Sequence, residues 1–205
     1  MKYYETKFEE YVSVCDKKNL HPELIDIFDD LNEAGVNIIL YGPAGVGKYT
    51  QALKSIRGSS ASGLKYERKM TIDMLKGKQY SFKISDIHFE VDMEILGCNA
   101  RVLWDEIYKA ILDILSTRPS HKGIIMCKNF HKIHNELLDI FYSYMQSLEY
   151  KNIDISFIII TESVSFFPQT ILNRCITIPI KRPTKSQYKK CVGASLFKEI
   201  DICNI

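Results

Sequence analysis

One glycine-rich segment constrains the fold of this chain more than any other feature. It follows the apolar run 36–41 directly and reads Gly42-Pro43-Ala44-Gly45-Val46-Gly47-Lys48-Tyr49-Thr50. The residues after it favour a helix, so the segment lies between a predicted strand and a predicted helix. Glycines in such a turn let the backbone wrap closely around a phosphate, and the helix N-terminus adds a partial positive charge. The segment therefore predicts a P-loop that binds the phosphates of a nucleotide.

Two positions in this loop bear on the chemistry that it can support. Lys48 brings an ammonium group to the outer phosphates. The next position should offer a small hydroxyl to Mg²⁺, but Tyr49 stands there and Thr50 comes one residue later. The loop thus predicts nucleotide binding and leaves hydrolysis open.

Length and composition are those of a globular protein with one large domain. The chain has 205 residues, of which 46% are hydrophobic and 25% are charged. A net charge of +2 gives no case for a strongly basic nucleic-acid binder. The six cysteines are scattered with no C-x-x-C pair and no signal peptide precedes them, which predicts reduced thiols inside the cell. The longest apolar run is too short to span a bilayer, so we expect no membrane association.

Strand-like and helix-like segments alternate along the rest of the chain. The strands are predicted at 36–41, 66–73, 80–85, 88–92, 123–127, 155–160 and 175–178, and the main helices at 22–34, 48–57, 99–115 and 134–149. Residues 80–85 and 88–92 alternate as two half-buried strands do. Trp104 and Tyr108 fall on the apolar face of a helix, which favours a place in the core. This order predicts a three-layer α/β/α sandwich with a mainly parallel sheet and an extra β-hairpin.

In three ordered features the chain resembles the clamp-loader branch of the AAA+ ATPases, the replication factor C small subunits. The run 39–50 is similar to that family's P-loop, and the strand pair at 80–92 resembles the extra hairpin of its non-hydrolysing subunit type. Residues 170–175, Thr-Ile-Leu-Asn-Arg-Cys, resemble the Ser-Arg-Cys motif of clamp loaders, with Asn173 in place of the serine. The resemblance implies a AAA+ nucleotide-binding domain over 1–183, followed at 184–205 by the start of a lid or a C-terminal tail.

The resemblance also implies roles for single residues. Arg174 would be an arginine finger that reaches the nucleotide of a neighbouring subunit, where a guanidinium stabilises charge on the transferring phosphoryl group. Thr161 and Glu162 would occupy the sensor position near the γ-phosphate, where Thr161 could place a hydroxyl, whereas Glu162, an unusual residue beside a polyanion, could simply face solvent. Tyr11 and Val12, in the N-terminal arm, would contact the adenine.

The sequence departs from the family where the metal is held. Hydrolysing members end the strand equivalent to 123–127 with an Asp-Glu pair, but here the aligned residues are Lys128 and Asn129. A lysine cannot hold Mg²⁺ and an asparagine cannot act as a base, and Tyr49 removes the other usual ligand. His131 and His134 have no third ligand near them in sequence, so we predict no metal site. We therefore expect binding of ATP or ADP with little or no hydrolysis and no clear role for Mg²⁺.

Two other interpretations stay open. The chain could be an active P-loop ATPase whose acid comes from Glu90 or Asp92, or a P-loop scaffold with no part in replication. A further hypothesis is that Lys48 and Lys128 together neutralise the phosphates without a metal.

The resemblance implies partners as well. They would be the other clamp-loader subunits of a hetero-oligomeric ring, a sliding clamp and primer-template DNA, at the nuclear or cytoplasmic site of DNA replication. The basic segment with Lys181, Arg182 and Lys185 is the candidate for contacts with DNA phosphates, which carry no sequence information.

Overall fold

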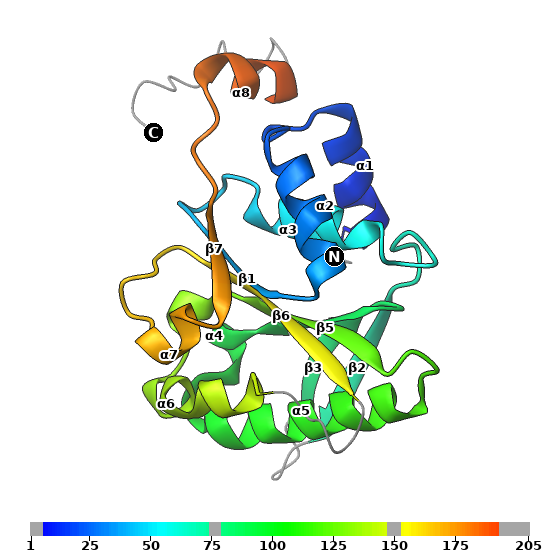
Figure 1. The fold of residues 1–205 in the computed structure, drawn as a ribbon, viewed down its shortest axis with the longest axis vertical. Coiled ribbons are helices and arrows are strands. Elements are labelled where there is room, and N and C mark those ends of the chain that lie inside the picture. The colour runs from blue at the N-terminus through cyan, green and yellow to red at the C-terminus, as the bar shows by residue number, and fades with distance from the viewer. Residues whose placement is uncertain (1–5, 74–78, 147–152, 193–205) are drawn as a thin grey trace.

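A single sheet of seven strands organises the molecule. The computed structural model describes residues 6–73, 79–146 and 153–192, and Figure 1 shows the sheet between two layers of helices. The strand order is β2-β3-β4-β5-β6-β1-β7. The strands span β1 Asn37–Tyr41, β2 Arg68–Asp73, β3 Gln79–Ile84, β4 His88–Asp92, β5 Lys122–Lys128, β6 Asp154–Thr161 and β7 Cys175–Pro179.

Five of these strands, β4, β5, β6, β1 and β7, run parallel to one another. The central strands are covered on both faces, which explains why they read as continuous apolar runs rather than as alternating ones. In β6, for example, every residue of 157–161 is buried. The predicted three-layer α/β/α sandwich with a mainly parallel sheet is confirmed.

Helices cover the two faces of the sheet in two groups. One face carries α1 Phe8–Lys17, α2 Leu24–Ala34 and α3 Lys48–Arg57. The opposite face carries α4 Met93–Leu96, α5 Ala100–Thr117, α6 Asn135–Tyr144 and α7 Gln169–Leu172, with the short 3₁₀ helices η1 Gly97–Asn99 and η2 Phe130–Lys132. The predicted helix 134–149 is shorter than expected, and its residues 147–149 lie outside the described part of the chain.

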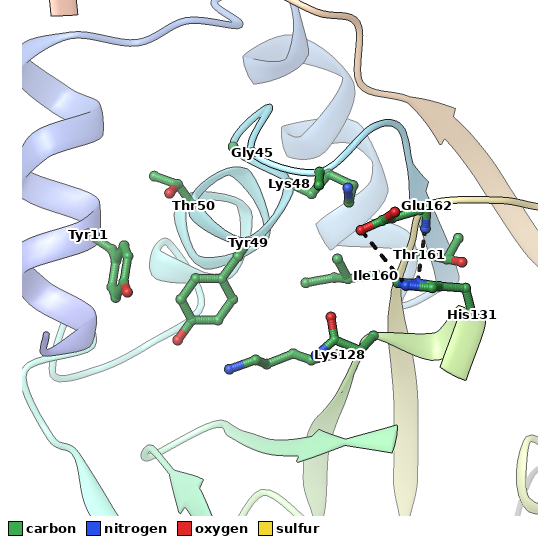
Figure 2. A pocket seen from close by; sticks show the side chains of 13 residues that line it. Tyr11, Gly45, Lys48, Tyr49, Thr50, Lys128, His131, Ile160, Thr161 and Glu162 are labelled. Atoms are coloured by element: carbon green, nitrogen blue, oxygen red, sulfur yellow. Dashed lines mark hydrogen bonds and ion pairs between the residues drawn. The ribbon is translucent and has the colours of Figure 1, made fainter. Parts of the chain in front are cut away.

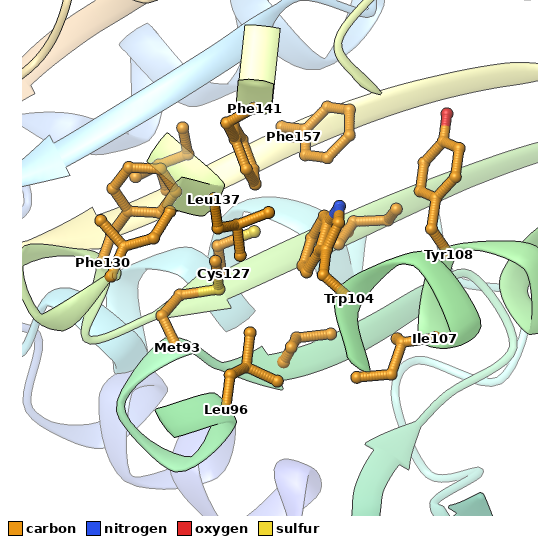
Figure 3. Packing of buried hydrophobic residues seen from close by; sticks show 14 of the residues in the cluster. Met93, Leu96, Trp104, Ile107, Tyr108, Cys127, Phe130, Leu137, Phe141 and Phe157 are labelled. Atoms are coloured by element: carbon orange, nitrogen blue, oxygen red, sulfur yellow. The ribbon is translucent and has the colours of Figure 1, made fainter. Parts of the chain in front are cut away.

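The larger of the two cores lies under α5 and α6 (Figure 3). Trp104 is fully buried there, and its ring lies 5.1 Å from that of Phe141, which in turn lies 5.7 Å from Phe157 on β6. Tyr108 is buried beside Trp104, with its hydroxyl donating to the carbonyl oxygen of Tyr144. The predicted core positions of Trp104 and Tyr108 are therefore confirmed.

The expected β-hairpin is present but belongs to a larger unit. β3 and β4 pair antiparallel, with Ile84 opposite Phe89. The same β3 pairs antiparallel with β2 along its whole length, from Arg68–Ile84 to Asp73–Gln79, while β4 is also a parallel neighbour of β5. The hairpin thus extends the main sheet, so side chains of β4 lie close to the ends of the parallel strands.

The chain leaves the sheet after β7. The backbone N–H of Ile180 donates to the carbonyl oxygen of Tyr41 at 2.7 Å, and the chain then runs to α8 Lys185–Val192, which projects from the sheet beyond α2 in Figure 1. Gln187 ties the start of α8 to the carbonyl oxygen of Leu20 at 3.2 Å. The domain boundary at 183 stays a prediction. In the described residues, no helix combines the length and the apolar character needed to cross a membrane.

Candidate nucleotide-binding site

A pocket of about 390 Å³ opens where β1, β5 and β6 end. In parallel α/β sheets, ligands bind outside the carboxyl ends of the strands. The pocket is shown in Figure 2 and is lined by residues of the P-loop, α1, β5, η2 and β6, which are Tyr11, Ala44, Gly45, Gly47, Lys48, Tyr49, Thr50, Lys128, Asn129, His131, Ile160, Thr161 and Glu162.

Glycine is required at particular points of the P-loop. Gly45 and Gly47 adopt φ values of 74° and 93°, which side-chain-bearing residues rarely reach. At Gly42 the reason is close approach, because an added Cβ would lie 2.3 Å from the carbonyl oxygen of Ile180. The glycine spacing therefore reflects a loop that is turned tightly between β1 and α3.

Lys48 lies along the inside of this loop. Its Nζ donates to the carbonyl oxygens of Gly42 and Pro43, both at 2.6 Å, and the residue is only 8% exposed. Burial lowers the pKa of Lys48, and the negative charge of Glu162 partly opposes that shift. The ammonium is thus held among backbone atoms at the floor of the pocket.

Tyr49 points away from the P-loop, towards the hairpin side of the pocket. Figure 2 shows its ring between Tyr11 of α1 and Lys128 at the end of β5. The Tyr11 ring meets it edge-on with centroids 5.0 Å apart, and Lys128 Nζ lies 4.7 Å from its centroid. Burial, together with the nearby Glu90 carboxylate, raises the pKa of Tyr49. The position of a small metal-binding hydroxyl is therefore filled by an aromatic side chain bound elsewhere.

Glu90 is the buried centre of this arrangement. It is 4% exposed on β4, and its carboxylate lies 3.6 Å from Lys128 Nζ and 3.5 Å from His88 Nε2. Burial by itself would raise the pKa of Glu90, but the contact with His88 and the charge of Lys128 outweigh it, and the pKa is lowered. His88 is fixed in turn by Ser85, whose Oγ lies 2.5 Å from Nδ1. These side chains form a buried polar network that extends from β4 to Tyr49 of α3.

Asn129 and Asp92 form a second polar pair. The Asn129 Nδ2 donates to both carboxylate oxygens of Asp92, at 3.0 and 3.1 Å, and Asp92 also accepts from the backbone N–H of Glu94 at the start of α4. Glu90 and Asp92, the two candidate acids, line a neighbouring cavity of about 220 Å³ that shares Lys128 with the P-loop pocket. Both carboxylates are therefore engaged outside the pocket that the P-loop lines.

Sequence reasoning missed the contribution of Glu162 to the site. Its side chain is 45% exposed, but it lines the pocket and its carboxylate lies 3.8 Å from His131 Nε2. The backbone N–H of Glu162 donates to His131 Nδ1 at 3.3 Å. Glu162 is thus exposed to solvent and also lines the pocket. The sequence did contain an indication of this role, because Glu162 directly follows Thr161 at the carboxyl end of a central strand, where ligands bind in parallel sheets.

Thr161 is fully buried and its backbone supports the loop. Its carbonyl oxygen accepts from the N–H of Gly42 at 3.3 Å, and its hydroxyl donates to the carbonyl oxygen of Ser163 at 2.8 Å. Tyr11 lines the pocket as expected, whereas Val12 is buried in the core between α1 and α3. The structure thus brings the P-loop, Tyr11 and Thr161 together and places Val12 behind them.

Arg174 lies at the amino ends of β1 and β7, whereas the P-loop follows the carboxyl end of β1. Arg174 directly precedes β7, at the end where Asn37 pairs with Cys175, and Asn37 Nδ2 donates to its carbonyl oxygen at 3.3 Å. The exposed guanidinium contacts Tyr142, with one nitrogen 3.3 Å from the hydroxyl. Lys181, Arg182 and Lys185 are exposed on the segment that leads into α8. None of these four residues joins the pocket within the described part of the chain.

The donor set of the pocket does not fit Mg²⁺. This ion takes oxygen ligands in octahedral geometry, usually carboxylates and hydroxyls beside the phosphates. Here one ligand position carries the aromatic side chain of Tyr49, packed against Tyr11, and the other carries the cation Lys128. In the described residues, no group of three or more His, Cys, Asp or Glu side chains could hold a metal ion.

Comparison with solved structures identifies the fold. Thermotoga maritima RuvB, a Holliday junction branch migration motor, matches with a TM-score of 0.52 and 16% identity over 95% of this chain and 54% of its own. Caenorhabditis elegans PCH-2 matches with a TM-score of 0.57 and 12% identity, over 97% and 55% of the two chains. The fold is that of the AAA+ P-loop NTPases.

A third match is Saccharomyces cerevisiae RIF2, with a TM-score of 0.50 and 13% identity over 91% of this chain and 68% of its own. The chain spans about half the length of RuvB and PCH-2. No protein-family model matches the sequence, and no curated protein sequence matches it either. At these identities the similarity establishes the AAA+ fold, and it does not identify the activity or the partners of this chain.

Proposed function

We propose that this chain is the nucleotide-binding subunit of a clamp-loader-type assembly, holding ATP or ADP at its P-loop with little or no hydrolysis. One observation carries the proposal. An intact glycine loop with Lys48 lies beside two metal-ligand positions, and Tyr49 and Lys128 at those positions are both engaged with Glu90. Such a site retains the groups that bind phosphates and lacks those that position a metal ion and polarise water.

The base of the nucleotide would lie against α1. Tyr11 is half-buried at the rim of the pocket, and its ring is already oriented by Tyr49. An aromatic face at this point can stack on a purine, while the P-loop and the N-terminus of α3 take the phosphates.

Arg174 supports a role in an assembly rather than in this chain's own site. β7 and β1 run parallel, so Arg174 and the P-loop lie at opposite ends of the same strands, roughly 15 Å apart for strands of this length. An exposed guanidinium there can reach a nucleotide only on a neighbouring subunit. Lys181, Arg182 and Lys185, exposed towards α8, would add salt-dependent contacts to DNA phosphates.

Titration with fluorescent ADP and ATP tests the binding half of this proposal. Lys48→Ala should weaken binding by roughly 10- to 100-fold, because hydrogen bonds to charged groups contribute about 1.5–3 kcal/mol. Lys109→Ala is the matched control, since this lysine is exposed on α5 on the other face of the sheet. Equal affinities for Lys48→Ala and the unmodified protein would refute nucleotide binding at the P-loop.

A further inference from the structure

We infer that this chain binds the phosphates of its nucleotide without a divalent cation, with the Lys128 ammonium supplying the charge that a metal ion would otherwise supply. The inference rests on the proposed function, because it concerns the same P-loop pocket. It follows from the mismatch between the donor set of that pocket and the ligands that Mg²⁺ requires.

The first step is the side chain that stands where a metal ligand is expected. Lys128 ends β5, the strand next to β6, and is one of the residues that line the pocket. The Lys128 ammonium cannot ligate a metal ion, and a metal ion bound in the same pocket would be repelled by its positive charge. Tyr49 cannot compensate, because its ring is packed against Tyr11 and lies 4.7 Å from Lys128 Nζ, on the Glu90 side of the pocket.

The second step is the freedom of Lys128 to serve a phosphate. Its Nζ lies 3.6 Å from Glu90 Oε2, which is longer than a hydrogen bond, and 4.7 Å from the centroid of the Tyr49 ring. The side chain remains 33% exposed and borders both the P-loop pocket and the adjoining cavity. A flexible four-carbon stem can therefore carry the ammonium from Glu90 towards a phosphate.

The third step is the balance of charge. Of the described residues that line the pocket, two are lysines, Lys48 and Lys128, and a single one is a carboxylate, Glu162. His131 lies beside Glu162, with Nε2 3.8 Å from the carboxylate. Two lysines and one carboxylate give the lining a net charge of +1, and the N–H groups of the P-loop and the N-terminus of α3 add partial positive charge that attracts a diphosphate.

Calorimetric titration with ADP, in MgCl₂ and in EDTA, tests this inference. We expect dissociation constants that agree within about twofold in the two buffers. In EDTA, Lys128→Met should weaken binding on the order of tenfold, since one charged contact to phosphate is lost. Lys132→Met is the matched control, an exposed lysine four residues further on that does not line the pocket, and it should bind as the unmodified protein does.

Folding of the variant is checked with Lys128→Arg, which keeps the cation and should restore most of the affinity. Tight binding only in MgCl₂, or unchanged affinity in Lys128→Met, would overturn the inference while leaving nucleotide binding in place. The proposed function would fail separately, and with it this inference, if no Lys48-dependent binding occurred in either buffer.

Discussion

Gly42, the first residue of the P-loop, packs against Ile180, the residue after the edge strand β7, and replacing Gly42 with alanine tests this packing. The new Cβ would lie 2.3 Å from the carbonyl oxygen of Ile180, a backbone atom that cannot rotate away. Restoring ordinary contact requires a shift of about 1 Å or more. That shift would disturb the hydrogen bond from the Ile180 N–H to Tyr41, which is 2.7 Å long.

Two costs add up in Gly42→Ala. Overpacking in a well-packed region costs about 1–3 kcal/mol, and a weakened backbone hydrogen bond costs about 0.5–1.5 kcal/mol. The free energy of unfolding should therefore fall by about 2–4 kcal/mol. For a chain of 205 residues this corresponds to a decrease in Tm of roughly 4–16 °C.

Gly58→Ala is the matched control for this experiment. Gly58 has helical φ and ψ values of −60° and −31°, and nothing lies within 4 Å of its added Cβ. Alanine at this position should leave the stability unchanged or raise it by up to about 1 kcal/mol, because it reduces the conformational entropy of the unfolded chain. Thermal and urea unfolding followed by circular dichroism measure both variants. A Gly42→Ala protein as stable as the unmodified one would refute the close approach of β7 to the loop.

Three further predictions follow from the buried network, the exposed arginine and the core. The pKa of Glu90 is lowered from its ordinary value of 4.5, so the ionised carboxylate stabilises the fold above pH 4.5 and this contribution is lost on acidification. Between about pH 6 and about pH 3, the free energy of unfolding measured in urea should therefore fall more for the unmodified protein than for Glu90→Gln. Arg174→Ala should lower the ATPase rate of a partner subunit while leaving this chain's affinity for ADP unchanged, and an unaltered partner rate would exclude the finger role. Trp104→Ala removes a fully buried ring and should cost about 3–5 kcal/mol in chemical unfolding, whereas a cost below about 1 kcal/mol would contradict the core assignment.

Local pattern was sufficient to predict the P-loop and the strands around it. The glycines of residues 42–47, the apolar run before them and the helix after them are neighbours in sequence, and so their geometry follows from short-range rules. The departures at Tyr49 and Lys128 could also be recognised in the sequence, because they are substitutions at known positions of a known motif.

Contacts between distant segments could not be predicted in the same way. Glu90 meets Tyr49 only because β4 pairs with β5 as well as with β3, and period-two alternation does not specify that second partner. Glu162 lines the pocket beside His131, which comes 31 residues earlier in the chain. Val12 was predicted at the adenine, but its place on the inner face of α1 buries it against α3. In each case the tertiary arrangement of the elements, not the local sequence, decides which side chains meet.

A single-turnover experiment tests the central claim most directly. The protein in excess would be mixed with γ-labelled ATP in MgCl₂, and bound nucleotide and free phosphate would be quantified beside Lys48→Ala. We predict that the label is recovered as bound ATP, that binding depends on Lys48, and that no phosphate is released. Release of phosphate that Lys48→Ala abolishes would contradict the account, because it would require a catalytic carboxylate at a site where Tyr49 and Lys128 hold Glu90.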